Sequence, residues 1–357
     1  MDVLLCNKNV MMRNPVLVRE KLEVIRKGGN EKLIVISDFD YTLSRVHDLS
    51  NNECITTYGV FDAALIEKAP IIYQKLEELK AKFIPIEFDP NIPTEEKIPH
   101  MEEWWESAHE QILRASLTRE DIEKSVMNAK LEFRDGVVDM IKNLEYLQIP
   151  LIVFSAGIGD VIEVFLRNQL RTVPQNVRIV SNMMTYDENG VISGFSDPLI
   201  HTFSKNGSVI VNNSSFYCDV AKRTNRLLLG DSLGDVAMDE GLNNDGISLK
   251  IGFLNPLRSE LSVDGRLEKY LGEYDIVIRF DQTVTVPHLL LKLFTQGCYE
   301  SDIQKSKGSI VRSLDCNYTS SVEKDDNEEE ACSQRLVDGV QVRNKISSNR
   351  KKCISEN

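Results

Sequence analysis

Short apolar segments recur along the chain and predict the strands of a buried sheet. Leucine, isoleucine and valine dominate these segments with little polar alternation, which is typical of parallel strands covered on both faces. The predicted strands are Lys32–Ser37, Leu151–Phe154, Arg178–Ser181, Arg226–Gly230, Ser248–Ile251 and Asp275–Ile278. Helical patterns lie between several of them, at Asp135–Gln148, Gly159–Gln169, Leu233–Asp239, Pro256–Tyr270 and Pro287–Phe294. This alternation predicts an α/β fold with a doubly wound, Rossmann-like parallel sheet that binds ligands at the carboxyl ends of its strands.

A long interval between the first two predicted strands breaks this alternation and carries its own helical patterns. These patterns cover Asp62–Lys82, Met101–Ala115 and Thr118–Lys130. Thr118 and Asp121 have the spacing of a capping box at the start of the last pattern. Four prolines of the interval are expected in loops: Pro85, Pro90, Pro93 and Pro99. We therefore predict a first piece of the core over residues 1–47, an inserted α-helical cap over 48–134, and the remainder of the α/β core over 135–298.

Two further segments differ from the core pattern. Asp187-Glu188-Asn189-Gly190 is a hairpin turn signal between two short extended runs. Residues 299–357 are rich in serine, asparagine, lysine and glutamate and show little periodicity. Because such a segment buries too little apolar area to offset the entropy of the chain, we predict a disordered tail.

Composition and charge exclude several classes of partner. The 357 residues are 42% hydrophobic and 27% charged, as in soluble globular proteins. A net charge of −13 argues against nucleic acid or an anionic membrane as the main partner. The longest uncharged apolar run is too short to span a bilayer, and the N-terminus lacks a secretory signal pattern. The cysteines are odd in number, 7, and thinly spread, so we expect a reduced cytosolic chain. Separately, we expect the protein to be a monomer.

The clearest chemical signal is a pair of carboxylates, Asp38 and Asp40, directly after the first predicted strand. Like charges this close raise one another's pKa unless a cation or a proton holds them. Mg²⁺ meets that need, because it prefers oxygen ligands and binds through one or two carboxylates together with phosphate oxygens of a substrate. A single aspartate at a strand end is more often a turn or cap residue, so this pair alone is weak evidence.

A second pair of carboxylates strengthens the prediction of a metal site. Asp231 and Asp235 follow the strand Arg226–Gly230, and glycines on both sides of Asp231 allow a tight turn. If the strands are parallel, both pairs reach the same edge of the sheet. Four carboxylates at one edge make a magnesium site more probable than four separate caps.

Two further elements indicate that the site binds phosphate. Ser155 and Ala156 follow a strand and lead through glycines into a helix, and main-chain N–H groups at a helix start bind phosphate well. An ordinary helix cap is the alternative there. Lys205 lies between this segment and Asp231 in the sequence. A lone lysine is usually a solvated charge, but at this place it can hold phosphate and nucleophile together.

These four elements, in this order, resemble the haloacid dehalogenase superfamily of phosphotransferases. Within that superfamily, several segments are similar to the cytosolic 5′-nucleotidase III family, which acts on pyrimidine and 7-methylguanosine monophosphates. They are Asp38–Arg45, Ile86–Pro90, the stretch ending at Trp105, Phe154–Glu163, the stretch ending at Phe195, and Leu227–Met238. The resemblance extends from Pro15 to Leu293 and does not include the tail.

The resemblance implies a Mg²⁺-dependent 5′-nucleotidase that hydrolyses nucleoside monophosphates such as CMP, UMP or 7-methyl-GMP through a phosphoaspartyl intermediate. It implies that Asp38 is the nucleophile and that Asp40 is the general acid and then the base. Metal would be held by Asp38, by the main-chain carbonyl of Asp40 and by Asp231, with support from Asp235. Phosphate would be bound by Ser155, the Ala156 main chain and Lys205, and the base by Glu87 in a loop of the cap.

The choice of base stays open at this stage. Trp104 and Trp105 are the only tryptophans, and one of them could stack on a base, but core packing is an equal alternative. Neighbouring helix positions point about 100° apart, so only one is expected to face the site. The next residues, Glu106 to His109, differ from the family's Thr-Lys-Ser-His, and a surface position is the simpler expectation for His109.

Two rival functions remain: another phosphatase of the superfamily, for instance one acting on phosphoserine, and an inactive nucleotide-binding protein. Phosphoryl transfer to a nucleoside could accompany hydrolysis.

Overall fold

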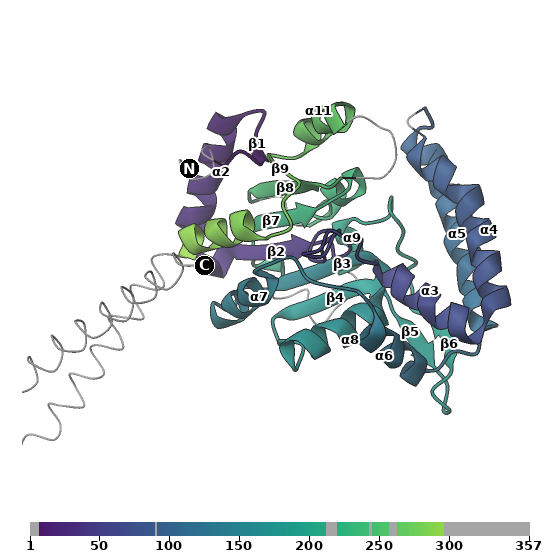
Figure 1. Ribbon diagram of the computed structural model, residues 1–357. Helices are drawn as coiled ribbons and strands as arrows, with labels where there is room; N and C mark the ends of the chain where they lie inside the picture. Colours follow the sequence, from purple (N-terminus) through teal and green to yellow (C-terminus); the bar gives the residue numbers. More distant parts are fainter. Residues whose placement is uncertain (1–6, 90, 212–219, 243–244, 257–262, 296–357) are drawn as a thin grey trace, which may run out of the picture. The chain divides into compact units, whose positions relative to one another are not determined.

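The computed structural model describes residues 7–89, 91–211, 220–242, 245–256 and 263–295 (Figure 1). The tail predicted at residues 299–357 lies outside the described residues. Within the described part of the chain, no helix has both the length and the apolar character that crossing a membrane would require.

A seven-stranded sheet with the order β1-β9-β8-β7-β2-β3-β4 forms the centre of the fold. Its strands are β1 (Val10–Met11), β2 (Leu33–Ser37), β3 (Leu151–Ile158), β4 (Val177–Asn182), β7 (Asn225–Gly230), β8 (Ser248–Leu254) and β9 (Ile276–Arg279). All neighbouring pairs are parallel except β1 and β9. The predicted strands are confirmed, and β1 is an addition. The strand order reverses between β2 and β7, which is where open α/β sheets bind ligands.

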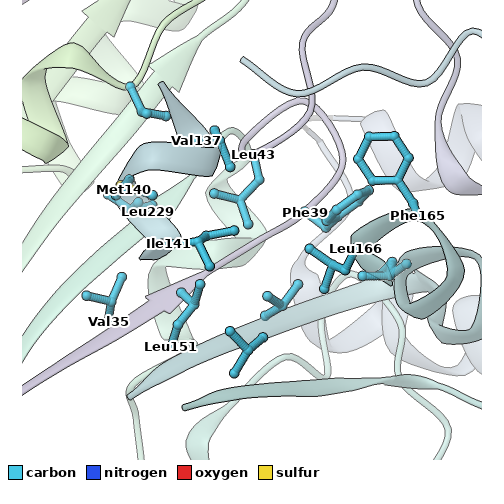
Figure 2. Close-up of a cluster of buried hydrophobic side chains, with 14 of the residues drawn as sticks. Val35, Phe39, Leu43, Val137, Met140, Ile141, Leu151, Phe165, Leu166 and Leu229 are labelled. Carbon is cyan, nitrogen blue, oxygen red and sulfur yellow. The ribbon is translucent and has the colours of Figure 1, made fainter. Parts of the chain in front are cut away.

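Both faces of the sheet are buried, as the uninterrupted apolar runs predict. Leu33 and Val35 of β2 belong to one hydrophobic cluster, and Ile34 and Ile36 belong to another. Figure 2 shows the first cluster, in which three neighbouring strands meet the helices α7 (Val137–Tyr146) and α8 (Gly159–Leu170). Its labelled side chains are Val35, Leu151 and Leu229 of the strands, Val137, Met140 and Ile141 of α7, Phe165 and Leu166 of α8, and Phe39 and Leu43. Phe39 and Leu43 are fully buried, so the loop after β2 is anchored in the core.

Helices and short turns cover the sheet. The other helices around the sheet are α2 (Pro15–Gly28), η1 (Asn30–Lys32), α9 (Gly207–Val211), η2 (Leu233–Ala237), α11 (Val263–Glu273) and a helix over residues 285–295. The segment predicted as an α-helix from Leu233 is instead the 3₁₀ turn η2, because Ser232 and Asp235 close a tight capping box. The helix predicted from Pro256 is described only from Val263, since residues 257–262 lie outside the described part.

The interval between β2 and β3 is helical, as predicted. It contains α3 (Thr57–Lys68), α4 (Pro70–Phe88), α5 (Thr94–Leu113) and α6 (Arg119–Asn128), and α4 and α5 lie side by side (Figure 1). The single helix predicted over Asp62–Lys82 is wrong, because the chain breaks at Ala69 and Pro70 starts a new helix. A proline disfavours helical backbone at the preceding residue but suits a first helical position. The described residues belong to one compact unit, so the boundaries of core and cap remain predictions.

Two prolines expected in loops lie inside helices, which corrects that prediction. Pro85 is in α4 and Pro99 is in α5, whereas Pro93 precedes α5 and Pro90 lies outside the described residues. Each interior proline removes a helical hydrogen bond. The two helices nevertheless continue, because Phe83 of α4 packs with apolar side chains of α5, including both tryptophans. Packing between α4 and α5 therefore outweighs the free energy that each interior proline costs its helix.

Both local turn predictions are confirmed. Thr118 accepts a hydrogen bond from Asp121 N, and Asp121 accepts one from Thr118 N, which completes the capping box of α6. The hairpin pairs β5 (Met184–Tyr186) with β6 (Ile192–Phe195), and Gly190 has a φ of +75° in its turn.

Removing the cap of α6 should destabilise the protein measurably. We expect Thr118→Ala to lower the free energy of unfolding by about 1 kcal/mol, because the N–H of Asp121 loses its partner. Urea denaturation followed by circular dichroism measures this change. Thr118→Ser retains the hydroxyl and should lose much less; equal losses in the two variants would contradict the capping assignment.

Candidate active site

The carboxyl ends of β2, β3 and β7 border a cavity of about 320 Å³. Most of the site residues that the sequence predicts line this cavity: Asp38, Asp40, Glu87, Trp105, Ser155, Ala156, Lys205, Asp231 and Asp235. Trp104 is the exception and lines a neighbouring cavity. The sheet therefore brings together residues that are far apart in the sequence, at the point where its strand order reverses.

Backbone pairing between β2 and β7 sets the positions of the two aspartate pairs. The N–H of Asp38 donates to the carbonyl of Leu229 at 2.9 Å, which continues the parallel pairing into the loop. A Cβ at Gly230 would lie 2.4 Å from Cβ of Asp235, so glycine allows Asp235 to fold back against the strand. There, Asp235 Oδ2 accepts hydrogen bonds from the main-chain N–H groups of Asp231 and Ser232 and from the Ser232 hydroxyl.

Lys205 joins the two aspartate pairs. Its ammonium donates to Asp38 Oδ1 at 2.7 Å and also to Asp235 Oδ1. Lys205 is 4% exposed, so this is a buried ionic contact. Burial alone would lower the pKa of Lys205, but the charges of Asp235 and Asp38 raise that pKa above its ordinary value. Lys205 therefore stays charged.

One lysine does not neutralise all the carboxylates of the site. Oxygens of Asp38, Asp231 and Asp235 lie within 4.8 Å of one another. Burial, followed by neighbouring carboxylates, raises the pKa of Asp231, and burial raises the pKa of Asp38 to about 7 despite Lys205. Because the donors are all carboxylate oxygens and carry excess negative charge, this cluster fits a hard divalent cation.

Asp40 makes different contacts from those of the three clustered carboxylates. Its Oδ1 accepts from the N–H of Thr57 at 2.8 Å, and its Oδ2 accepts from the hydroxyl of Thr57 at 2.6 Å. Burial raises the pKa of Asp40 to about 6, although both hydrogen bonds from Thr57 lower it. A carboxyl group with this pKa can both release and take up a proton near neutral pH.

The segment predicted as a phosphate seat is strand rather than turn. The sequence analysis ends the strand at Phe154, but β3 continues to Ile158 with an irregular register against β4. The helix α8 begins at Gly159, so the predicted glycine-rich turn is wrong in form. The Ser155 hydroxyl still faces the cavity and accepts from the N–H of Gly157 at 3.0 Å.

A second, mostly apolar cavity of about 440 Å³ adjoins the first. Both cavities are lined by Tyr41, Thr56, Tyr58, Glu87 and Trp105. Trp105 contacts both, whereas Trp104 stacks on Phe83 with ring centroids 5.9 Å apart. Aromatic surface next to a carboxylate cluster is suited to a flat apolar group carried by an anionic substrate.

Glu87 reaches this junction from a helix, not from a loop as predicted, because it lies in the last turn of α4. Its carboxylate accepts from the Thr202 hydroxyl at 2.6 Å, and burial raises the pKa of Glu87. Lys97 donates to the main-chain oxygen of Glu87 at 2.7 Å rather than to its carboxylate.

Several supporting residues were not found from the sequence. Arg134 is 1% exposed and donates to the main-chain oxygens of Tyr41 and Thr42 and to Asn255 Oδ1. Asn255 in turn donates to Asp231 Oδ2 at 3.3 Å. These contacts fix Tyr41, whose φ of 61° is unfavourable for a bulky residue, in the loop after β2 that also carries Asp38 and Asp40.

Thr57, Tyr270 and Tyr274 were also missed. The hydroxyl of Tyr270 in α11 donates to the carbonyl of Asp231, and the hydroxyl of Tyr274, just after the end of α11, donates to the carbonyl of Ser232. Of these three residues, only Thr57 had a signal in the sequence. It follows Thr56, and threonine is a residue type that commonly caps the start of a helix. Tyr270 lies in an amphipathic helix and Tyr274 directly follows it, and the sequence of this segment does not indicate the loop that the two residues contact.

His109 lies against the hairpin rather than at either cavity. Its ring stacks on Phe195 with centroids 3.7 Å apart, and its Nε2 has no hydrogen-bond partner among the residues that the structure describes. His109 is therefore partly buried, which corrects the expectation of a surface position. Burial lowers its pKa to about 4.

Removing the charge of Lys205 should destabilise the metal-free protein. We expect Lys205→Met to lower the free energy of unfolding by roughly 3 kcal/mol at pH 8 in EDTA, because two buried carboxylates lose their cation. Urea denaturation provides the measurement. Lys205→Arg keeps the charge and is the control; a Met variant as stable as the wild type would contradict this account of the charges.

Stability should fall in acid partly through His109. The unfolded chain takes up a proton at this residue below its ordinary pKa of 6.5, whereas the folded protein does so only near 4. Folded-state stability is therefore lost between these two values as the pH falls. We expect the free energy of unfolding of His109→Gln to rise by roughly 2 kcal/mol relative to that of the wild type between pH 7 and pH 5, measured by urea denaturation. Parallel pH profiles for the two proteins would refute this.

Comparisons with known proteins identify relatives of this chain. The sequence model of a family described as pyrimidine 5′-nucleotidase (UMPH-1) matches residues 41–295. The chain is 43% identical over 297 residues to the putative cytosolic 5′-nucleotidase 3 of Caenorhabditis elegans, which covers 83% of this chain and 78% of that protein. It is 38% identical over 294 residues to the 7-methylguanosine phosphate-specific 5′-nucleotidase of Homo sapiens, covering 82% and 95%. The crystal structure of cytosolic 5′-nucleotidase IIIB bound to cytidine matches with a TM-score of 0.73 and 31% identity, covering 84% of this chain and 97% of that one. The chain therefore belongs to the pyrimidine 5′-nucleotidase (UMPH-1) family.

Proposed function

We propose that the protein is a Mg²⁺-dependent 5′-nucleotidase that hydrolyses nucleoside 5′-monophosphates to nucleoside and phosphate. The observation that carries this proposal is the junction of two cavities, one lined by the carboxylates and Lys205 and the other by aromatic side chains. An anionic phosphate ester with a flat base matches both. The names of the relatives support the same reaction.

Each site residue has a role in this proposal. Asp38 is the nucleophile, and Lys205 together with Ser155 and the Ala156 main chain binds the phosphate oxygens. Asp231, Asp38 and the main-chain carbonyl of Asp40 are the proposed ligands of Mg²⁺, and Asp235 supports them through its bonds to the loop of Asp231. Bound Mg²⁺ supplies positive charge that offsets repulsion between a phosphate dianion and a carboxylate nucleophile.

Asp40 transfers protons in both halves of the reaction. It first protonates the ribose 5′-oxygen as that oxygen leaves phosphorus, and then accepts a proton from the water that attacks the phosphoaspartyl group. Splitting the hydrolysis into two steps lowers each barrier. Its pKa of about 6 suits both roles near neutral pH.

The base is proposed to enter the apolar cavity that Trp105 and Tyr58 line together, with Glu87 at its polar edge. Pyrimidine and 7-methylguanine bases are both candidates. The family description and the cytidine complex of the similar structure favour the first, and the name of the human relative favours the second. A phosphoserine-type activity is disfavoured, because a serine side chain would leave the aromatic cavity empty. An inactive nucleotide-binding protein is disfavoured by the complete set of site residues.

We further propose that the protein acts as a monomer in the cytosol. The name of the C. elegans relative supports the location. Transfer of the phosphoryl group to a nucleoside instead of water would use the same phosphoaspartyl group.

Phosphate release from a panel of substrates tests the proposed function. We expect the purified protein with Mg²⁺ to hydrolyse at least one of CMP, UMP and 7-methyl-GMP far faster than phosphoserine, and EDTA to abolish the activity. Asp38→Asn should lower kcat by at least about 10³-fold without loss of folding, because the amide cannot attack phosphorus. Turnover of none of these nucleotides, or full activity in EDTA after dialysis, would refute the proposal.

A further inference from the structure

We propose that Thr57, the first residue of α3, is the positioning residue that holds Asp40 in line for proton transfer to the leaving group. This inference rests on the proposed function, in which Asp40 is the general acid. Thr57 does not belong to the four motifs of the site, so the inference comes from the contacts that the folded structure shows.

Thr57 donates a hydrogen bond to each oxygen of the Asp40 carboxyl group. Its N–H reaches Oδ1 at 2.8 Å and its hydroxyl reaches Oδ2 at 2.6 Å. Two bonds from one residue to the two oxygens of one carboxyl group fix both its position and the plane in which it lies. Thr57 is completely buried, so its two donor groups have no access to water.

The surroundings also fix the direction of the threonine hydroxyl. The N–H of Ile158 points at Thr57 Oγ1 at 3.4 Å, so this oxygen accepts from β3 and gives its own hydrogen to Asp40. Gly157 leaves the space that this requires, because a Cβ there would lie 2.1 Å from Thr57 Oγ1 and 3.1 Å from Asp40 Oδ2. The absence of a side chain at position 157 therefore lets α3, Asp40 and Ser155 approach each other.

The helix that carries Thr57 is firmly seated. Thr56 caps α3 by accepting from the N–H of Gly59 at 3.2 Å. Val60, Phe61 and Leu65 of the same helix are fully buried in the cluster that contains Phe39. Thr57 thus connects a rigid helix to the acid, and Asp40 is held from outside its own loop.

The chemistry defines what this positioning should affect. A bond forms between Asp38 and phosphorus, and the bond from phosphorus to the 5′-oxygen breaks with its electron pair on that oxygen, which takes the proton of Asp40. Water then attacks phosphorus and gives a proton to Asp40, and the electron pair of the broken acyl phosphate bond returns to Asp38. Only the first step depends on the leaving group, and kcat/KM reports that step.

A comparison of leaving groups separates positioning of the acid from general damage. A ribose 5′-alkoxide is a poor leaving group that needs protonation, whereas p-nitrophenolate leaves as a stable anion. We expect Thr57→Val to lower kcat/KM for the best nucleotide about 10- to 100-fold, with a change of less than about 3-fold for p-nitrophenyl phosphate. Thr57→Ser keeps the hydroxyl and should restore most of the nucleotide activity. Thr57→Ala serves as the second hydroxyl-free variant if the Val variant does not fold.

Two controls distinguish the possible failures. The wild type must hydrolyse the nucleotide, and its inactivity would overturn the proposed function rather than the role of Thr57. Thr118→Ala loosens α6, another helix of the same interval, without touching Asp40, and should change both kcat/KM values by the same factor. The positioning role is overturned if Thr57→Val lowers kcat/KM equally for both substrates. It is also overturned if Thr57→Ser loses as much kcat/KM for the nucleotide as Thr57→Val does.

Discussion

Crowding of carboxylates at the carboxyl ends of β2 and β7 is the constraint on which the site depends. Three of them lie within 4.8 Å of one another, buried among strands whose residues are apolar. Such charges repel strongly in a medium of low dielectric. Lys205 offsets part of this repulsion. Hydrogen bonds that Asp235 accepts from the loop after β7 offset a further part. The remaining excess of negative charge makes the cluster suited to a divalent cation.

The sheet and the four motifs could be predicted because their signals are local. A buried parallel strand is a run of apolar residues, and a site residue at its end follows directly in the sequence. Parallel geometry then brings Asp38 and Asp231 to one edge without further information. The helix boundaries were less predictable. Pro85 and Pro99 fit loops by local preference, and they are helical because packing between α4 and α5 supplies more energy than each proline costs.

The supporting residues could not be predicted, because their roles arise only from contacts across the fold. Arg134 and Asn255 act on Tyr41, from distant positions in the chain, and Tyr270 acts on the loop of Asp231. None of them stands in a distinctive local pattern. A buried arginine that donates mainly to main-chain oxygens holds loops in place, and only the arrangement of the strands shows which loops these are.

The helical interval therefore contributes to the chemistry as well as to the shape of the pocket. Thr57 of α3 holds Asp40, and Glu87 of α4 accepts from Thr202, which lies three residues before Lys205. One contact reaches the acid, and the other reaches the segment that carries the ammonium group. In the proposed function, a base that binds beside Glu87 would contact a side chain that is already bonded to the segment of Lys205. Through these contacts, binding of the base would affect the arrangement of the groups around the phosphate. Efficient catalysis uses the binding energy of such remote, unreactive parts of a substrate in this way.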